Sequence, residues 1–141
     1  MTDLLAPQPP GIPLPLPSAF SAPYWEACDR GELVFRRCVA CGTALADAPR
    51  VCWHCRGRDL SWEVSTGRGH LYSWTVVWRP QTPSFTVPYA PAIVRLEEGI
   101  HVVSALVGCR PDELAQDLAL EVVFHPAGEG RLLPYFRPAG A

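Results

Sequence analysis

The chain has 141 residues, a net charge of −2 and a hydrophobic content of 48%. This length supports one modest core, or a small barrel with a metal-bound appendage. The near-neutral charge disfavours general nucleic-acid binding, which usually requires a basic excess. No apolar run approaches the ~20 residues of a membrane helix. We therefore expect a cytoplasmic protein that does not enter a membrane.

The N-terminal segment, residues 1–17, contains six of the sixteen prolines. Proline fixes φ and lacks an N–H, which excludes a helix here and favours an extended, polyproline-like arm. Such an arm is either disordered or laid over a neighbouring surface. Three apolar residues between the prolines would favour docking: Ile12, Leu14 and Leu16.

Residues 18–33 are predicted to form one helix. Ser21 is suited to capping its start, Pro23 is accepted in a first turn, and Gly31 fits the position after its end. Helical spacing places four apolar side chains on one face of this helix: Phe20, Tyr24, Trp25 and Cys28. This face either packs against the barrel or docks another subunit.

Two Cys-x-x-Cys hooks lie within residues 34–64, one formed by Cys38 and Cys41 and the other by Cys52 and Cys55. Each hook presents two thiolates to one side of a metal ion, and two hooks close a tetrahedral shell. Four sulfur ligands leave no position for water or substrate. We therefore predict a structural zinc ion in a ribbon over residues 34–64.

Other roles for these cysteines fit less well. Paired disulfides would suit a secreted domain, but the sequence opens without a signal-peptide pattern. In a reducing cytosol, this spacing is more typical of metal ligands. Iron in a rubredoxin-like site uses the same ligands, although rubredoxins separate their hooks more widely. Cys28 and Cys109 stand alone and need no function beyond packing.

Arginine is unevenly distributed along the chain. All twelve basic residues are arginines, and eight of them lie between Arg30 and Arg79, against four acidic residues. Residues 80–141 hold four arginines against seven acidic residues. The arginine-rich middle could meet phosphates or an acidic partner, since the guanidinium group binds both. A solvated surface is the alternative.

Residues 65–138 change to a pattern of strands and turns, rich in β-branched and aromatic residues. Glu98-Gly99 predicts a tight hairpin turn, and a short turn or helix is expected over residues 111–117. Five strands with one short helical insertion predict a mainly β fold that ends in a five-stranded OB-fold barrel. The predicted strands cover residues 70–78, 92–96, 100–107, 120–125 and 132–136.

A series of motifs in one order carries a family resemblance over about residues 20–138. They are Tyr24-Trp25-Glu26-Ala27, Gly31-Glu32-Leu33, Arg37-Cys38, Cys41-Gly42, Pro49-Arg50, Cys52, Cys55, Gly67-Arg68-Gly69-His70-Leu71-Tyr72-Ser73-Trp74-Thr75, Arg79-Pro80, Pro88-Tyr89, Glu97-Glu98-Gly99 and Leu133-Pro134-Tyr135-Phe136-Arg137-Pro138. The series resembles the zinc-ribbon/OB-fold proteins associated with acyl-CoA metabolism, first catalogued as domain of unknown function thirty-five. Trp53 stands where relatives often have proline, but the predicted ligands are intact.

This resemblance implies an N-terminal helix, a zinc ribbon and an OB-fold barrel. Relatives are small accessory subunits of thiolase-like enzymes, including acetoacetyl-CoA thiolase with hydroxymethylglutaryl-CoA synthase, phloroglucinol acyltransferases and steroid side-chain aldolases. There the small subunit helps to hold acyl-CoA or shapes the partner's active site, and the nucleophilic cysteine belongs to the partner. The resemblance thus implies a non-catalytic subunit with acyl-CoA as a possible ligand.

The residues themselves agree with a non-catalytic role, since no Ser, His and Asp occur at a recognisable triad spacing. Gly67-Arg68-Gly69 is the best candidate for ligand contact, because glycine allows close backbone approach and arginine binds phosphate. The alternative is an ordinary turn, with the aromatic residues in the core. As a hypothesis, seven residues line the barrel face that meets CoA or the partner: Arg68, Arg79, Arg137, Trp74, Trp78, Tyr89 and Phe136.

Two other function classes stay open. An OB barrel with a zinc ribbon could bind single-stranded nucleic acid by aromatic stacking in a basic groove, although the acidic second half counts against this. The chain could also be an independent enzyme that hydrolyses or transfers acyl groups. We expect an accessory subunit whose thiolase-like partner lies against the helix, the ribbon or the proline arm.

Overall fold

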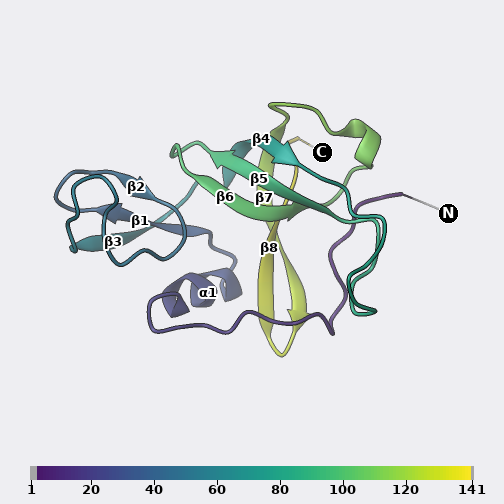
Figure 1. The fold of residues 1–141 in the computed structure, drawn as a ribbon, viewed down its shortest axis with the longest axis horizontal. Coiled ribbons are helices and arrows are strands. Elements are labelled where there is room, and N and C mark those ends of the chain that lie inside the picture. The colour runs from purple at the N-terminus through teal and green to yellow at the C-terminus, as the bar shows by residue number, and fades with distance from the viewer. Residues whose placement is uncertain (1–2, 141) are drawn as a thin grey trace.

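The computed structural model describes residues 3–140 and contains a small three-stranded sheet beside a closed five-stranded barrel (Figure 1). The predicted mainly β fold class, with a helix, a zinc ribbon and an OB-fold barrel, is confirmed. Within the described residues, no helix is long and apolar enough to cross a bilayer. The elements are α1 (Ala22–Asp29), β1 (Val34–Cys38), β2 (Ala44–Leu45), β3 (Leu60–Val64), β4 (Arg68–Trp74), β5 (Ala90–Leu96), β6 (His101–Leu106), a 3₁₀ helix (Pro111–Glu113), β7 (Ala119–Gly128) and β8 (Arg131–Pro138).

The small sheet forms the ribbon, with β1 in the centre and antiparallel to both β2 and β3. Its core is separate from that of the barrel and contains two of the predicted ligands together with Leu45 and Leu60. The start of β1 contacts the barrel instead, because Phe35 packs into the barrel core. The ribbon is therefore tied to the barrel at one end and depends on its own small core at the other.

The barrel has the strand order β4-β5-β6-β8-β7, and β4 pairs with β7 to close it. Only the β6–β8 pair is parallel among the described strands. β5 illustrates how the sequence directs the fold, because its buried residues recur at every second position, the period of a strand with one face in the core. These residues are Ala90, Ala92, Val94 and Leu96.

Glycine is required where β4 and β5 pair at Gly69. A Cβ added at Gly69 would lie 2.4 Å from the carbonyl oxygen of Arg95. The close approach of the two backbones leaves no room for a side chain. Strand pairing inside the barrel therefore explains why the Gly67-Arg68-Gly69 motif ends in glycine.

The first barrel strand is shorter than predicted, because β4 ends at Trp74 rather than at residue 78. Residues 75–89 form a connection that returns to the sheet through a single bridge between Val77 and Tyr89. Three prolines in this stretch lack the N–H that a paired strand would need. They are Pro80, Pro83 and Pro88.

The predicted helix over residues 18–33 is also shorter, covering Ala22–Asp29. Pro23 explains the late start, since a proline ring clashes with the carbonyl four residues earlier and fits only a first turn. Ser21 is the N-cap residue, but its hydroxyl accepts a hydrogen bond from the Ser18 amide at 2.8 Å instead of capping the helix. Gly31 follows the helix with φ 78°, as the sequence predicts.

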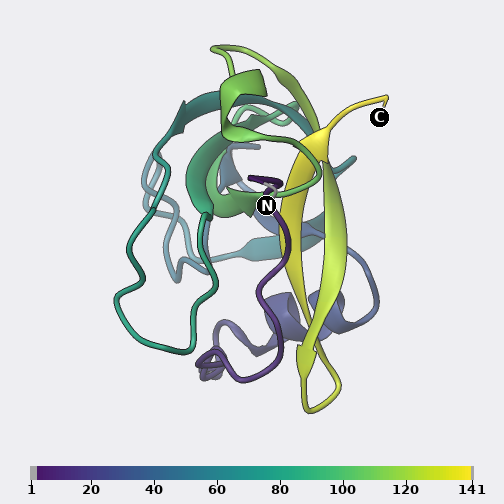
Figure 2. The same ribbon diagram turned by 90° about the vertical axis from the view of Figure 1, so that its right-hand side faces the viewer.

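The proline-rich arm lies on the barrel, which resolves the two alternatives in favour of docking (Figure 2). Leu5 is 1% exposed, and its backbone bonds to both Gly108 and Cys109 at 2.8 Å. The side chain of Gln8 bonds to both backbone groups of Thr86, at 3.0 and 2.8 Å. Leu5 and Gln8 thus fasten the arm to the barrel and to the β4–β5 connection.

Replacing Leu5 with alanine is expected to release the arm. We expect a loss of about 2 kcal/mol in the free energy of unfolding, the low end for a buried leucine, because the arm can detach without unfolding the barrel. Urea denaturation and limited proteolysis would measure the two effects. Leu16→Ala is the matched control, since Leu16 lies in the same arm but is 94% exposed. Equal proteolysis of the two variants would contradict this assignment.

Candidate functional site

The four predicted metal ligands converge at the end of the ribbon. Cys38 is the last residue of β1 and Cys41 lies in the turn that follows it, whereas Cys52 and Cys55 lie between β2 and β3. Their four sulfur atoms all lie within 4.8 Å of one another. The first cysteine of each hook is buried and the second is exposed.

The two hooks repeat the same backbone hydrogen bonds. In the first hook, the Gly42 amide donates to the Cys38 carbonyl at 2.8 Å, and in the second, the Arg56 amide donates to the Cys52 carbonyl at 2.9 Å. Both donor residues have positive φ, 79° for Gly42 and 64° for Arg56. The second hook thus adopts the turn of the first even though it lacks the glycine that favours this conformation.

The distances between sulfur atoms fit a tetrahedral metal site. The sulfurs of Cys38 and Cys55 are 3.5 Å apart, and those of Cys41 and Cys52 are 3.7 Å apart. A zinc ion with bonds of about 2.3 Å separates its sulfur ligands by about 3.8 Å, whereas a disulfide needs about 2.0 Å. Gly57 closes one side, because a Cβ there would lie 3.2 and 3.4 Å from two of the sulfurs. The residues present therefore fit a structural zinc ion.

Hydrogen bonding shifts the pKa values of two thiols of the cluster, Cys41 and Cys55. Hydrogen bonds from Thr43 lower the pKa of Cys41 to about 6. The Gly57 amide favours the thiolate of Cys55, but bonding to the neighbouring thiols raises its pKa to about 12. A bound cation would favour the thiolate form of Cys55. Burial raises the pKa of Cys28 to about 11, which fits a packing role.

The structure brings two of the predicted ligand-binding arginines together on one outer face. Arg68 of β4 and Arg137 of β8 both pair in register with Glu121 of β7, which lies between them. Each is exposed and holds a carboxylate, Arg68 with Glu97 at 3.0 Å and Arg137 with Glu121 at 2.9 Å. Hydrogen bonding from Arg68 lowers the pKa of Glu97. Both guanidinium groups are thus already engaged within the barrel.

Four other predicted residues lie at or beyond the opposite end of β4, and Trp74 at that end is roughly 20 Å from Arg68 by strand geometry. Trp74 ends the strand, whereas Trp78, Arg79 and Tyr89 belong to the connection that follows. Arg79 lies well beyond the end of β4, because the strand stops earlier than predicted, and it forms no ion pair within residues 3–140. The seven predicted residues therefore do not form a single surface.

Phe136 differs most from the hypothesis of a ligand-facing ring. It is 1% exposed and belongs to the barrel core with Leu106, its parallel partner in register on β6. Phe136 and its neighbour Tyr135 are the two buried residues of β8. Phe136 therefore packs the core and does not line an outer face.

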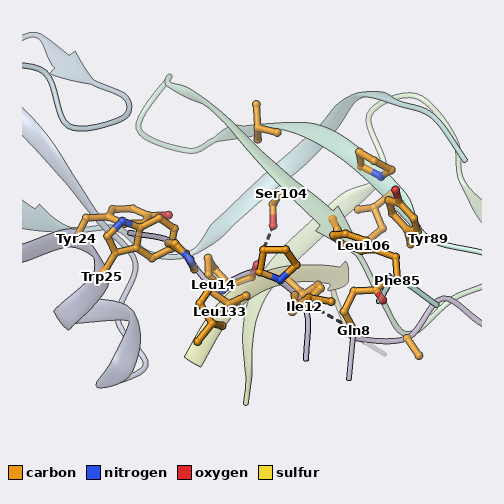
Figure 3. A pocket seen from close by; sticks show the side chains of 18 residues that line it. Gln8, Ile12, Leu14, Tyr24, Trp25, Phe85, Tyr89, Ser104, Leu106 and Leu133 are labelled. Carbon is orange, nitrogen blue, oxygen red and sulfur yellow. Dashed lines mark hydrogen bonds between the residues drawn. The ribbon is translucent and has the colours of Figure 1, made fainter. Parts of the chain in front are cut away.

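A pocket of about 500 Å³, not predicted from the sequence, lies between the proline arm, α1 and the barrel (Figure 3). Phe85 lines it and had not been singled out, although an aromatic pair flanked by prolines in the connection was a usable signal. Three predicted features do reach it: Tyr89, the helix residues Tyr24 and Trp25, and Ile12 and Leu14 of the arm. The lining residues include Gln8, Tyr24, Trp25, Phe85, Tyr89, Val103, Ser104 and Leu133.

These features define a zinc-ribbon/OB-fold protein with a closed, structural metal site and an apolar pocket outside the barrel. The family models agree with this class. Residues 25–61 match the ChsH2 rubredoxin-like zinc ribbon domain, and residues 62–125 match the ChsH2 C-terminal OB-fold domain. Together they cover the ribbon and most of the barrel.

Two individual relatives support the same family. A DUF35 domain-containing scaffold protein of Methanothermobacter thermautotrophicus is 33% identical over 118 residues, which cover 77% of this chain and 88% of that protein. A probable enoyl-CoA hydratase alpha subunit of Thermomonospora curvata is 35% identical over 127 residues, 90% of this chain. The chain spans 40% of the length of that second relative.

A solved structure gives the same result in three dimensions. One chain of the Ltp2-ChsH2(DUF35) aldolase superposes with a TM-score of 0.83 at 34% identity, and the match covers 89% of this chain and 99% of that chain. The protein belongs to the ChsH2/DUF35 family of zinc-ribbon/OB-fold proteins.

Proposed function

We propose that this protein is a non-catalytic accessory subunit that completes the active site of a thiolase-superfamily enzyme and binds its acyl-CoA. The match to the chain of the Ltp2-ChsH2(DUF35) aldolase is the main support, because it covers nearly the whole of that chain. The name of that structure pairs such a chain with a second protein in an aldolase. The scaffold names of the archaeal relatives support the same kind of role.

The metal site favours a scaffold over an enzyme. Four thiolates would saturate a zinc ion, so the ion would hold the two hooks together and offer no position for water or substrate. The hydratase names of two relatives do not conflict with this role. This chain covers 40% and 35% of those proteins, which leaves most of each relative for other activities.

Exposed apolar side chains support a partner surface on the ribbon and the arm. Val39 and Trp53 occupy equivalent positions in the two hooks and are 60% and 74% exposed. Leu16 of the arm projects into solvent as well. Apolar groups in such positions are stabilised when a partner covers them. The partner thus lies against the ribbon and the arm in this proposal.

Among the proposed CoA contacts, Arg79 is the most suitable for a phosphate group. Its guanidinium has no carboxylate partner within the described residues, whereas those of Arg68 and Arg137 are shared with glutamates. Trp78, next to it, is exposed and could stack on a purine ring. We expect Arg79→Ala to weaken CoA binding by about tenfold, typical of a lost charge-assisted hydrogen bond.

The test combines partner capture with activity. The tagged chain, isolated from its native host, is expected to retain a thiolase-superfamily protein in a fixed ratio. The purified complex should turn over acyl-CoA, and the chain alone should not. Calorimetry with CoA would compare Arg79→Ala with the control Arg110→Ala, whose guanidinium pairs with Asp112. Thioester turnover by the isolated chain would refute the accessory role.

A further inference from the structure

We propose that the 500 Å³ pocket beneath the proline arm binds the hydrocarbon part of a bulky acyl thioester. This inference rests on the proposed acyl-CoA role and adds the class of acyl group and the place where it lies. The arginines of the barrel surface are not part of this site.

The walls of the pocket favour a neutral group. Within the described residues, no charged side chain lines it. Ser104 and Gln8 of the lining already have partners, since Ser104 donates to the Pro134 carbonyl at 3.1 Å and Gln8 bonds to Thr86. An anionic nucleotide would lose its hydration here without gaining a cation. The pocket therefore suits the acyl group rather than the CoA nucleotide.

Aromatic pairs stand at both ends of the pocket (Figure 3). Tyr24 and Trp25 of α1 meet edge to face, with ring centroids 4.9 Å apart, and Phe85 stacks on Tyr89 with centroids 5.6 Å apart. Aromatic rings bind other rings by stacked and edge contacts. A ligand that contains rings or a branched hydrocarbon would contact both ends, whereas an acetyl group could reach only one.

The volume supports the same conclusion. Pockets of about 300–1,000 Å³ enclose ligands of drug size, and this one falls within that range. Burial of apolar surface contributes about 25 cal/mol per Å². A small acyl group would leave most of the cavity unfilled and gain little. The acyl group we infer is therefore a bulky one.

The arm allows the ligand to enter. Within the described part of the chain, no hydrogen bond joins residues 9–17 to the barrel, so the arm is held at Leu5 and Gln8. Gly11, with φ 116°, supplies a flexible position within the free stretch. Displacement of residues 9–17 would open one wall of the pocket and leave the barrel unchanged.

The direct test uses N-phenyl-1-naphthylamine, a neutral two-ring probe that fluoresces when it leaves water. We expect the full chain to bind it at least tenfold more tightly than its sulfonated relative 8-anilino-1-naphthalenesulfonate. Leu133→Trp would fill the pocket and weaken binding at least tenfold. Leu132→Trp is the matched control, because Leu132 precedes it on β8 and does not line the pocket.

A second variant keeps the test interpretable if Leu133→Trp fails to fold. Val103 lines the pocket and is 79% exposed, so Val103→Glu places a charge at its edge without disturbing the core. We expect this variant to weaken probe binding as well. Equal binding by Leu133→Trp and Leu132→Trp, or no preference for the neutral probe, would overturn the proposal.

The identity of the occupant is tested by displacement. The 2-naphthoyl thioester of N-acetylcysteamine carries a bulky acyl group without a nucleotide, and we expect it to displace the probe. The acetyl thioester should not do so. Equal displacement by both, or release of the probe by a bound partner protein alone, would overturn the acyl assignment. Because these probes lack CoA, failure of partner capture would leave their outcome intact.

Discussion

Replacement of Cys52 with alanine is expected to abolish retention of zinc and to unfold the ribbon while the barrel stays folded. Cys52 is fully buried in the small ribbon core, which holds only four residues within the described chain, two of them ligands. A core this small supplies little stability, and a structural zinc ion contributes about 10–16 kcal/mol of apparent binding free energy. Elemental analysis would measure the metal, and hydrogen exchange would locate the unfolded segment. We expect lost protection over residues 38–60.

Cys28→Ala is the matched control for this experiment. Cys28 is equally buried and loses the same sulfur atom, but it lies in α1, away from the metal cluster. We expect it to retain one zinc ion and to lose roughly 1 kcal/mol of stability, the scale of one buried methylene group. If Cys52→Ala kept its metal, or if its barrel lost protection as well, the separate role of the ribbon would be wrong.

The metal centre could be predicted from sequence because its information is local. Two residues separate the cysteines of each hook, and the turn conformation follows from that short spacing and from Gly42. The same holds for the hairpin at Glu98-Gly99, where Gly99 has φ 90°. In these cases the residues that decide the conformation are neighbours in the chain, so tertiary packing has little to change.

The ligand-binding residues could not be predicted in this way, because tertiary contacts decide their surroundings. Arg68 and Arg137 are 69 positions apart, yet both lie beside Glu121 across neighbouring strands. The pocket depends even more on long-range packing, since Gln8 of the arm meets Thr86 of the β4–β5 connection. Proline content predicted an extended arm, but it could not say which surface the arm covers.

The pocket and the zinc ribbon are linked through α1. Tyr24 and Trp25 line the large pocket and also a second one, of about 280 Å³, against the ribbon residues Val34 and Phe35. Asp29 at the end of α1 holds Arg131 of the β7–β8 hairpin at 3.1 Å. The helix therefore contacts the ribbon on one side and the hairpin on the other. The helix thus lies where the ribbon, the hairpin and the pocket meet.

Replacement of Phe136 with alanine separates core packing from ligand binding at one position. Phe136 is among the largest fully buried side chains, so its loss leaves a cavity in a barrel that cannot collapse readily. We expect a loss of about 3–5 kcal/mol in the free energy of unfolding, or a fall of roughly 10–20 °C in the melting temperature. Chemical and thermal denaturation would measure both, with the zinc content unchanged because the ribbon has its own core.

Trp78→Ala provides the contrast, since it removes a larger aromatic side chain from an exposed position. We expect this variant to change stability by less than about 0.5 kcal/mol, as is usual for surface substitutions. If Trp78 contacts CoA, the same variant should weaken CoA binding. The reverse pattern, a stable Phe136→Ala protein that binds CoA poorly, would restore Phe136 to the ligand surface. That outcome would also require a different orientation of β8, because Phe136 is 1% exposed in the barrel core.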